Sequence, residues 1–228
     1  MSINVYWACM EDEWMRAEVP HSILKSFFEE TPLQESGLAR CPSIRDELSN
    51  TYGLKSIYDF EFTIVNNEVG TNYHDQDFFN NHLVIRSIKE KVFSFTQKFI
   101  FFTDSPSLLM TGNILPSLEK NHITERCMMP PGQFDIGKWF RPVEFSFILK
   151  PNENTFKISA GDTYQYIKFH TNDKINFIQF YHTDEIARLV NSVMNAKAYN
   201  KQNSILSYFY KIFKLKNRVL REIKDNVL

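Results

Sequence analysis

The sequence predicts a mostly β protein, in which an antiparallel β-sandwich or jelly-roll domain over residues 1–182 is followed by C-terminal helices over residues 183–228. Three observations predict this fold class. Short runs rich in Phe, Ile and Val recur about every ten residues with turn residues between them, as in sandwiches and barrels. The chain has 21 Phe and 10 Tyr but only 7 Gly, so large rings are expected to fill the interior. From Thr183 onward there is no Pro or Gly, and apolar residues recur at helical spacing.

Strands are expected wherever an apolar run ends at turn residues. The alternation of aromatic and polar residues is clearest over 55–65, where Asn66 and Asn67 then predict a turn. The predicted strands cover residues 3–9, 55–65, 83–87, 92–95, 99–103, 107–110, 145–149, 155–158, 164–170 and 176–180.

Short helical turns are predicted between the first strands. Residues 22–30 form one or two turns that end before Pro32, because the residue before a proline disfavours the helical conformation. Residues 41–48 begin a helix with Ser43 as its cap. Residues 74–81 are expected to form a loop or a helical turn, and residues 115–118 a short turn of helix.

The helical segment over 183–228 is expected to form two helices with a break near residues 199–203, packed on the β domain or on a partner. Thr183 is the expected cap of the first helix, with acidic residues in the first turn. The last helix is basic. Its candidate partner-binding residues are Lys211, Lys214, Arg218 and Arg221, and the alternative is a solvated face that matches the helix dipole.

Composition narrows the class of protein. With 43% hydrophobic and 23% charged residues, the chain is expected to be a soluble globular protein. The net charge of −1 gives no global field toward nucleic acid or an anionic membrane, so a nucleic-acid partner is not expected. No apolar run is long enough to span a membrane. Three cysteines without paired spacing favour a reducing cytoplasm over a disulfide scaffold.

Five sequence stretches follow one another along the chain: CPSIRDEL, IYDFEF, FIFFTDSPSLLM, CMMPPGQFDIGKWFRPVEFSFIL and ISAGDTYQYIKFH. Over about residues 41–180 the chain resembles an uncharacterised protein family of large tailed phages, notably cyanophages. The resemblance implies a phage gene whose product acts in the cytoplasm of the infected host cell or is built into the virion. It carries over no catalytic residue.

The stretch from Gly161-Asp162 to His170 also resembles the second half of a cupin-like double-stranded β-barrel. Many such barrels hold iron or another divalent metal with two histidines and a carboxylate. If this chain were such an enzyme, the metal candidates would be His74, Asp77 and His170, with Asp75, His82 and His182 as further choices. His74 and Asp77 could meet only in a helical turn. Otherwise no cofactor is expected.

Trp139 and Arg141 would point to the same side of an extended segment, where the guanidinium could stack on a neighbouring ring and grip a carboxylate or phosphate. Arg86 stands in an apolar run, so it lies either on the solvated face or in a paired site. Asp162 and His170 complete the candidate ligand-binding residues. For each of them a structural role is the alternative.

No catalytic motif is present: the chain lacks a nucleophile elbow, a phosphate-binding glycine loop and a dinucleotide fingerprint. The leading expectation is therefore a phage-encoded, non-catalytic protein that binds a host factor or a particle component. A cupin-like metal enzyme or small-ligand binder and a virion structural component are the alternatives. Whether the chain forms a homo-oligomer is left open.

Overall fold

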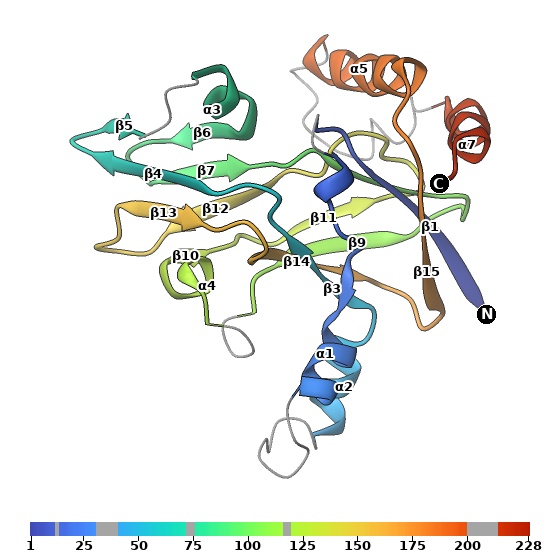
Figure 1. Cartoon of the computed structure of the whole chain (residues 1–228), viewed down its shortest axis with the longest axis horizontal. Helices are drawn as coiled ribbons and strands as arrows, with labels where there is room; N and C mark the ends of the chain where they lie inside the picture. The colour runs from blue at the N-terminus through green and yellow to red at the C-terminus, as the bar shows by residue number, and fades with distance from the viewer. Residues whose placement is uncertain (12–13, 31–40, 72–75, 116–119, 200–213) are drawn as a thin grey trace.

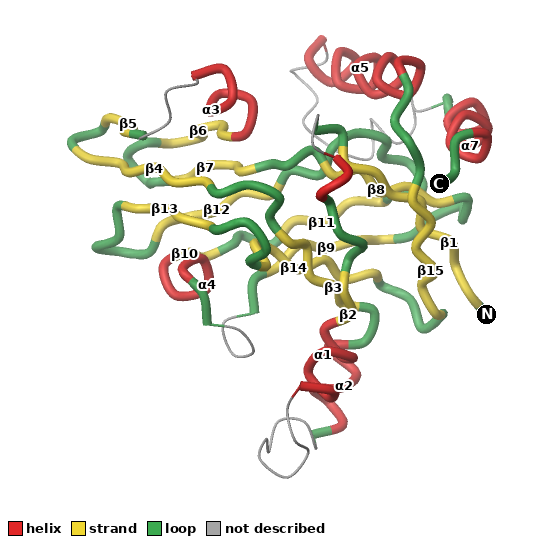
Figure 2. Tube along the Cα trace, in the orientation of Figure 1, coloured by secondary structure: helices red, strands yellow, loops and turns green. Residues whose placement is uncertain are grey.

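The computed structural model describes residues 1–11, 14–30, 41–71, 76–115, 120–199 and 214–228. Its described part is mostly β, with several antiparallel sheets and helices at the C-terminal end (Figures 1 and 2). This confirms the coarse fold class that the sequence predicted. None of the described helices is both long and apolar enough to cross a membrane.

Four sheets are formed by the described residues. In hydrogen-bonded order, the first sheet contains β15 (Lys174–Gln179), β1 (Ser2–Cys9) and β8 (Phe99–Thr103), and the second contains β10 (Cys127–Met128), β12 (Phe145–Leu149), β7 (Val92–Phe95) and β6 (Leu83–Ser87). The third contains β11 (Gly132–Asp135), β9 (Leu109–Asn113), β14 (Thr163–Phe169), β3 (Thr51–Lys55) and β2 (His21–Ser22). The fourth contains β13 (Thr155–Ile158), β4 (Phe60–Val65) and β5 (Glu68–Gly70).

The described helices lie between the strands and after the last of them. They are the 3₁₀ turn η1 (Trp14–Arg16), α1 (Ile23–Glu30), α2 (Pro42–Leu48), α3 (Gln76–His82), α4 (His122–Arg126), α5 (Asp184–Tyr199) and α7 (Lys216–Asp225). In Figure 1, α1 and α2 project from one end of the molecule, whereas α5 and α7 lie beside β1 and β15.

One pairing is parallel, which departs from a wholly antiparallel sheet. Strand β1 runs parallel to β15, with Ser2 opposite Lys174 and Trp7 opposite Gln179. It runs antiparallel to β8 on its other side. Because β1 opens the chain and β15 comes late in it, no hairpin turn constrains their relative direction.

Aromatic rings fill the space between the sheets, as the composition predicted. Phe62 of β4 lies 4.9 Å, centroid to centroid, from Phe93 of β7, which lies 4.9 Å from Phe156 of β13. These rings are at most 1% exposed. They belong to one core that also takes residues from β1, β9, β12 and β14. The interior is therefore a packed core.

The sheet formed by β15, β1 and β8 is covered on both faces. Val5 and Trp7 of β1 face the aromatic core, whereas the alternate residue Tyr6 faces a second apolar cluster. Helices α5 and α7 supply the other side of this second cluster through Ile186, Leu189, Val190, Val219 and Ile223. The C-terminal helices thus pack on the β domain across the boundary predicted at residue 182, and Phe180 forms an isolated bridge with Val227.

Two predicted strands have different bounds in the structure. The strand expected over 55–65 is divided, because the chain leaves one sheet at Lys55 and joins another at Phe60. The buried side chain of Gln97 holds this crossing: its Oε1 accepts a hydrogen bond from the Ile57 amide at 2.9 Å, and its Nε2 donates to Ser56 Oγ. The strand expected over 107–110 begins only at Leu109.

The predicted cap of α2 is wrong. Cys41 occupies the N-cap position, and it makes no side-chain capping hydrogen bond. Pro42 takes the first helical position, where its missing N–H matters least, so the helix begins two residues earlier than a Ser43 cap allows. The cap predicted for α5 is confirmed, since Thr183 Oγ1 accepts a hydrogen bond from the Ile186 amide at 3.2 Å. The turn predicted over 115–118 extends outside the described residues.

A candidate ligand-binding pocket on β9 and β14

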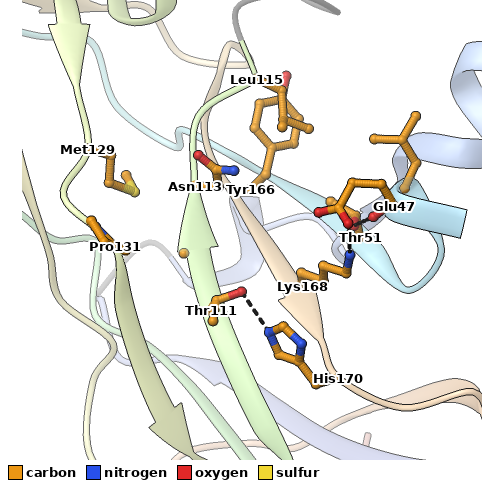
Figure 3. A pocket seen from close by; sticks show the side chains of 12 residues that line it. Glu47, Thr51, Thr111, Asn113, Leu115, Met129, Pro131, Tyr166, Lys168 and His170 are labelled. Atoms are coloured by element: carbon orange, nitrogen blue, oxygen red, sulfur yellow. Dashed lines mark hydrogen bonds and ion pairs between the residues drawn. The ribbon is translucent and has the colours of Figure 1, made fainter. Parts of the chain in front are cut away.

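A cavity of about 240 Å³ lies on the outer face of the sheet that contains β9 and β14 (Figure 3). Thr111 and Asn113 of β9 line it, together with Tyr166 and Lys168 of β14 and His170 directly after that strand. These residues are two apart in each strand, so their side chains leave the sheet on the same face. We refer to this cavity as the β9–β14 pocket.

The walls of the β9–β14 pocket are largely apolar. Leu48 at the end of α2 lines it. Met129 and Pro131 lie on the side of β9 away from Glu47 (Figure 3). Helix α2 is held there because Leu48 packs with Ile23 and the ring of Tyr166 in a small buried cluster. The pocket therefore combines a polar floor with apolar sides, as small-ligand sites commonly do.

Lys168 carries the positive charge on the floor of the pocket. Its Nζ lies 2.8 Å from Oε2 of Glu47, which α2 supplies. The Lys168 side chain is only 21% exposed, whereas that of Glu47 is 73% exposed. An ion pair whose carboxylate is in water contributes little to stability, so another carboxylate can replace Glu47 at small energetic cost.

His170 lies between two hollows. Its Nε2 is 3.0 Å from Thr111 Oγ1. A second cavity, of about 370 Å³, shares Lys168 and His170 with the β9–β14 pocket and continues past Asp46 and Ser49. The lysine and the histidine are thus accessible from both hollows, which makes β14 the centre of the candidate site.

The chemistry offered here is that of a binding site for a polar or anionic group. The donors that line the pocket include an ammonium, an amide and a hydroxyl group, from Lys168, Asn113 and Thr111 respectively. Within the part of the chain that the structure describes, no three His, Cys, Asp or Glu side chains are arranged to hold a metal ion. His74 and Asp75 lie outside that part, so the full predicted metal set is not described.

The other candidate residues of the cupin-like hypothesis lie elsewhere. Asp77 is in the first turn of α3 and does not line either cavity that contains His170. Asp162 closes the turn before β14: its carboxylate accepts a hydrogen bond from the Ser159 amide at 3.2 Å, and its carbonyl accepts one from the Ser56 amide at 2.8 Å. Both roles are structural.

His82 is buried against Glu11. Its Nδ1 donates a hydrogen bond to the Phe78 carbonyl at 2.7 Å, while its Nε2 lies 3.3 Å from Glu11 Oε2. Lys98 Nζ lies 3.2 Å from the other oxygen of Glu11. Burial raises the pKa of Glu11, but the hydrogen bond with His82 and the charges of His82 and Lys98 outweigh it, so the pKa is lowered overall.

Three predicted ligand-binding residues come together in a second place. The guanidinium carbon of Arg141 lies 5.0 Å from the centroid of the Trp139 ring, which confirms the predicted stacking of the guanidinium. Both Arg141 and Arg86 contact Glu144, Arg141 at 3.7 Å. We call Arg86, Trp139, Arg141 and Glu144 the arginine cluster. Sequence reasoning missed Glu144, although its spacing of three residues from Arg141 was a usable signal.

Most of the basic residues of α7 contact other residues of the same chain. Arg218 pairs with Glu185 of α5 at 2.5 Å, and Lys224 with Asp104 at 3.6 Å. Lys214 and Arg221 are exposed, and Lys211 lies outside the described residues. Two of the four predicted partner-binding residues, Lys214 and Arg221, are therefore exposed charges, whereas Arg218 joins α7 to α5.

Sequence reasoning also missed Lys168 and Glu47. The alternation Tyr166–Lys168–His170 was visible as a period of two, and it placed a lysine and a histidine on one face of a strand. Glu47 had no such signal, because only the packing of α2 brings it to β14. Comparison of the chain with protein-family models, with curated proteins and with solved structures finds no match.

Proposed function

We propose that this protein acts by binding, without catalysis, and that the β9–β14 pocket receives a carboxylate-bearing group of its partner. The observation that carries the proposal is the pairing of Lys168 with Glu47. The Lys168 side chain, 21% exposed, lines a cavity, and its counterion is a mostly exposed carboxylate from a neighbouring helix. A carboxylate of the partner would take the place of Glu47 on Lys168.

The shape of the pocket supports an amphipathic ligand. Leu48, Leu115 and Met129 offer apolar contacts to the body of the ligand, while Lys168 and Asn113 offer donors to its acidic group. A short peptide segment in which an acidic residue stands between apolar ones has this chemistry. A cavity of about 240 Å³ suits one or two side chains. The partner is therefore proposed to be a protein that presents such a segment.

The resemblance to a phage protein family supplies the setting of the proposal. A phage-encoded binding protein would meet a host factor in the cytoplasm of the infected cell, and a virion component would meet another particle component. Both partners are proteins, and the same pocket would serve either.

A jelly-roll or cupin-like arrangement with iron or another divalent metal stays a separate prediction. Elemental mass spectrometry on a His74→Ala variant and on the unchanged protein tests it.

The binding proposal is tested with two blocked tripeptides, Leu-Glu-Leu and Leu-Gln-Leu, added to isotope-labelled protein in an NMR titration. We expect the Glu peptide to shift the amide signals of Thr111, Asn113 and Lys168, and the Gln peptide to shift them much less. The variant Lys168→Met should lose the response. Lys174→Met, which changes an exposed lysine of β15, is the matched control and should keep it.

Two outcomes would contradict the proposal. If both peptides shift the same signals equally, the carboxylate is not what the pocket recognises. If the shifts map to α7 and not to β9 and β14, the binding surface is the basic helix that the sequence suggested first.

A further inference from the structure

The arginine cluster lies on the outer face of another sheet, apart from the β9–β14 pocket. Arg86 stands at a β-bulge: Ile85 pairs with Phe93 and Ser87 with Val92, so Arg86 is the extra residue of β6. A bulge bends its strand and re-aims a side chain. Here Arg86 Nε donates to Ser94 Oγ at 3.2 Å, and its terminal nitrogen reaches Glu144.

The charges of the arginine cluster do not balance. Two guanidinium groups share the single carboxylate of Glu144. Arg141 is only 9% exposed, and its burial lowers its pKa, with the charge of Arg86 acting in the same direction and that of Glu144 in the opposite one. A buried guanidinium that shares its only carboxylate with a second guanidinium is incompletely neutralised, which costs free energy. A further negative charge would therefore stabilise the cluster.

The hydrogen bonds of Arg141 show where a further anion would bind. Its Nε and Nη2 form one edge of the guanidinium, the edge that holds carboxylates and phosphates through two parallel hydrogen bonds. Glu144 reaches only Nη2, at 3.7 Å, which is too long for a hydrogen bond. Nε is buried and has no hydrogen-bond acceptor among the described residues. The binding edge is therefore without a well-placed acceptor.

Aromatic packing fixes the plane of this edge. Trp139 packs against Arg141 and also against Phe134, whose ring centroid is 5.0 Å from that of Trp139 at an interplanar angle of 27°. Because the guanidinium is held against the indole face, it can present its edge without first losing conformational freedom. Such preorganisation favours binding of a planar or tetrahedral oxyanion.

We propose that Arg86 and Arg141 form an oxyanion site for a phosphate or carboxylate group, and that Glu144 occupies it as an internal counterion. The ligand enters between the two guanidinium groups, and the carboxylate of Glu144, whose side chain is 19% exposed, turns toward solvent. Arg86, whose side chain is 50% exposed, forms the open side of the site. This site goes beyond the proposed function and does not depend on the β9–β14 pocket.

The test compares variants of the full chain in NMR titrations with inorganic phosphate, with acetate as the carboxylate arm and sodium chloride as the ionic-strength control. Glu144→Gln removes the competing carboxylate, so we expect it to bind phosphate about tenfold more tightly than the unchanged protein, the effect of one charge-assisted hydrogen bond. The shifted signals should include the Nε–H of Arg141. Tighter binding of acetate than of phosphate would identify a carboxylate as the ligand.

The matched control is Glu153→Gln. It frees Arg126 from an ion pair of 2.6 Å. Among the residues that the structure describes, no second arginine and no stacked ring join this pair, so no gain in phosphate affinity is expected. The double variant Arg86→Met/Glu144→Gln should lose the gain in phosphate affinity. Because Arg86 is half-exposed, its substitution should not prevent folding. Equal gains in Glu144→Gln and Glu153→Gln, or no gain in Glu144→Gln, would overturn the proposal and leave a structural Arg–Glu–Arg group.

Discussion

The ring of Phe145 lies directly against Gly112 on the side of β9 that faces away from the β9–β14 pocket: a Cβ at Gly112 would be 2.6 Å from the ring atoms Cε1 and Cζ. Phe145 is 2% exposed and belongs to β12, so this contact joins two sheets. Strand β9, which lines the pocket with one face, is thus held in position by the ring of Phe145 on its other face.

Gly112→Ala is expected to destabilise the protein by about 2 kcal/mol, because the added methyl group overpacks the site and the buried ring cannot turn away. Urea unfolding measures the change. Gly70→Ala is the control: its Cβ would be 3.3 Å from Thr63 Oγ1 at an exposed position, and little change is expected. A Gly112→Ala protein as stable as the unchanged one would show that the two sheets can separate at this point.

Ile223→Ala is expected to lower the free energy of unfolding by about 3 kcal/mol, because Ile223 is fully buried between α7 and the sheet of β1 and β8. Val227→Ala, at a 45% exposed position of the same C-terminal segment, should have little effect. Thermal unfolding of the two variants provides the comparison. Equal, small effects would mean that the C-terminal helices contribute nothing to the stability of the β domain.

Glu11 makes folding stability dependent on pH. Its pKa is lowered from 4.5 in the folded protein, so its stabilising contribution is present above that pH and is lost as the pH falls through the lower, folded value. Glu11→Gln removes the carboxylate that pairs with Lys98 and contacts the buried His82, and it should cost about 2 kcal/mol at neutral pH.

The stability difference between Glu11→Gln and the unchanged protein should therefore shrink as the pH is lowered. Urea unfolding at a series of pH values between neutral and acid measures it. Other acids with lowered pKa, such as Asp135, are present in both proteins and cancel in the difference. A difference that does not vary with pH would mean that Glu11 is held only by packing.

The three cysteines should react at different rates with iodoacetamide. Burial raises the pKa of Cys9 and of Cys127 to about 12, so neither forms a thiolate near neutral pH. The hydrogen bond between the Cys41 thiol and the Ser43 hydroxyl lowers the pKa of the partly exposed Cys41. We expect Cys41 to be alkylated first, as measured by peptide mass spectrometry, and Ser43→Ala to slow it. Simultaneous labelling of Cys9 would indicate that β1 opens in the native state.

Much of the fold was predictable because the signals are local. A strand is recognised from alternation within a few residues, and the cap of α5 from Thr183 just before an acidic turn. Trp139 and Arg141 are two residues apart, so their stacking also followed from the local chain direction. The crossing at residues 56–59 was not predictable, because it depends on the side chain of the distant Gln97.

The sequence by itself determined a mostly β chain with an aromatic interior and amphipathic helices at its end, since these depend on composition and periodicity. Only the tertiary structure decided that Glu47 meets Lys168, that Arg86 and Arg141 share Glu144, and that Arg218 pairs with Glu185. The physical reason is that these pairs depend on which strands are neighbours, in which register, and on which face a helix docks. Those choices are made by the packing of the whole core, which no short stretch of sequence encodes.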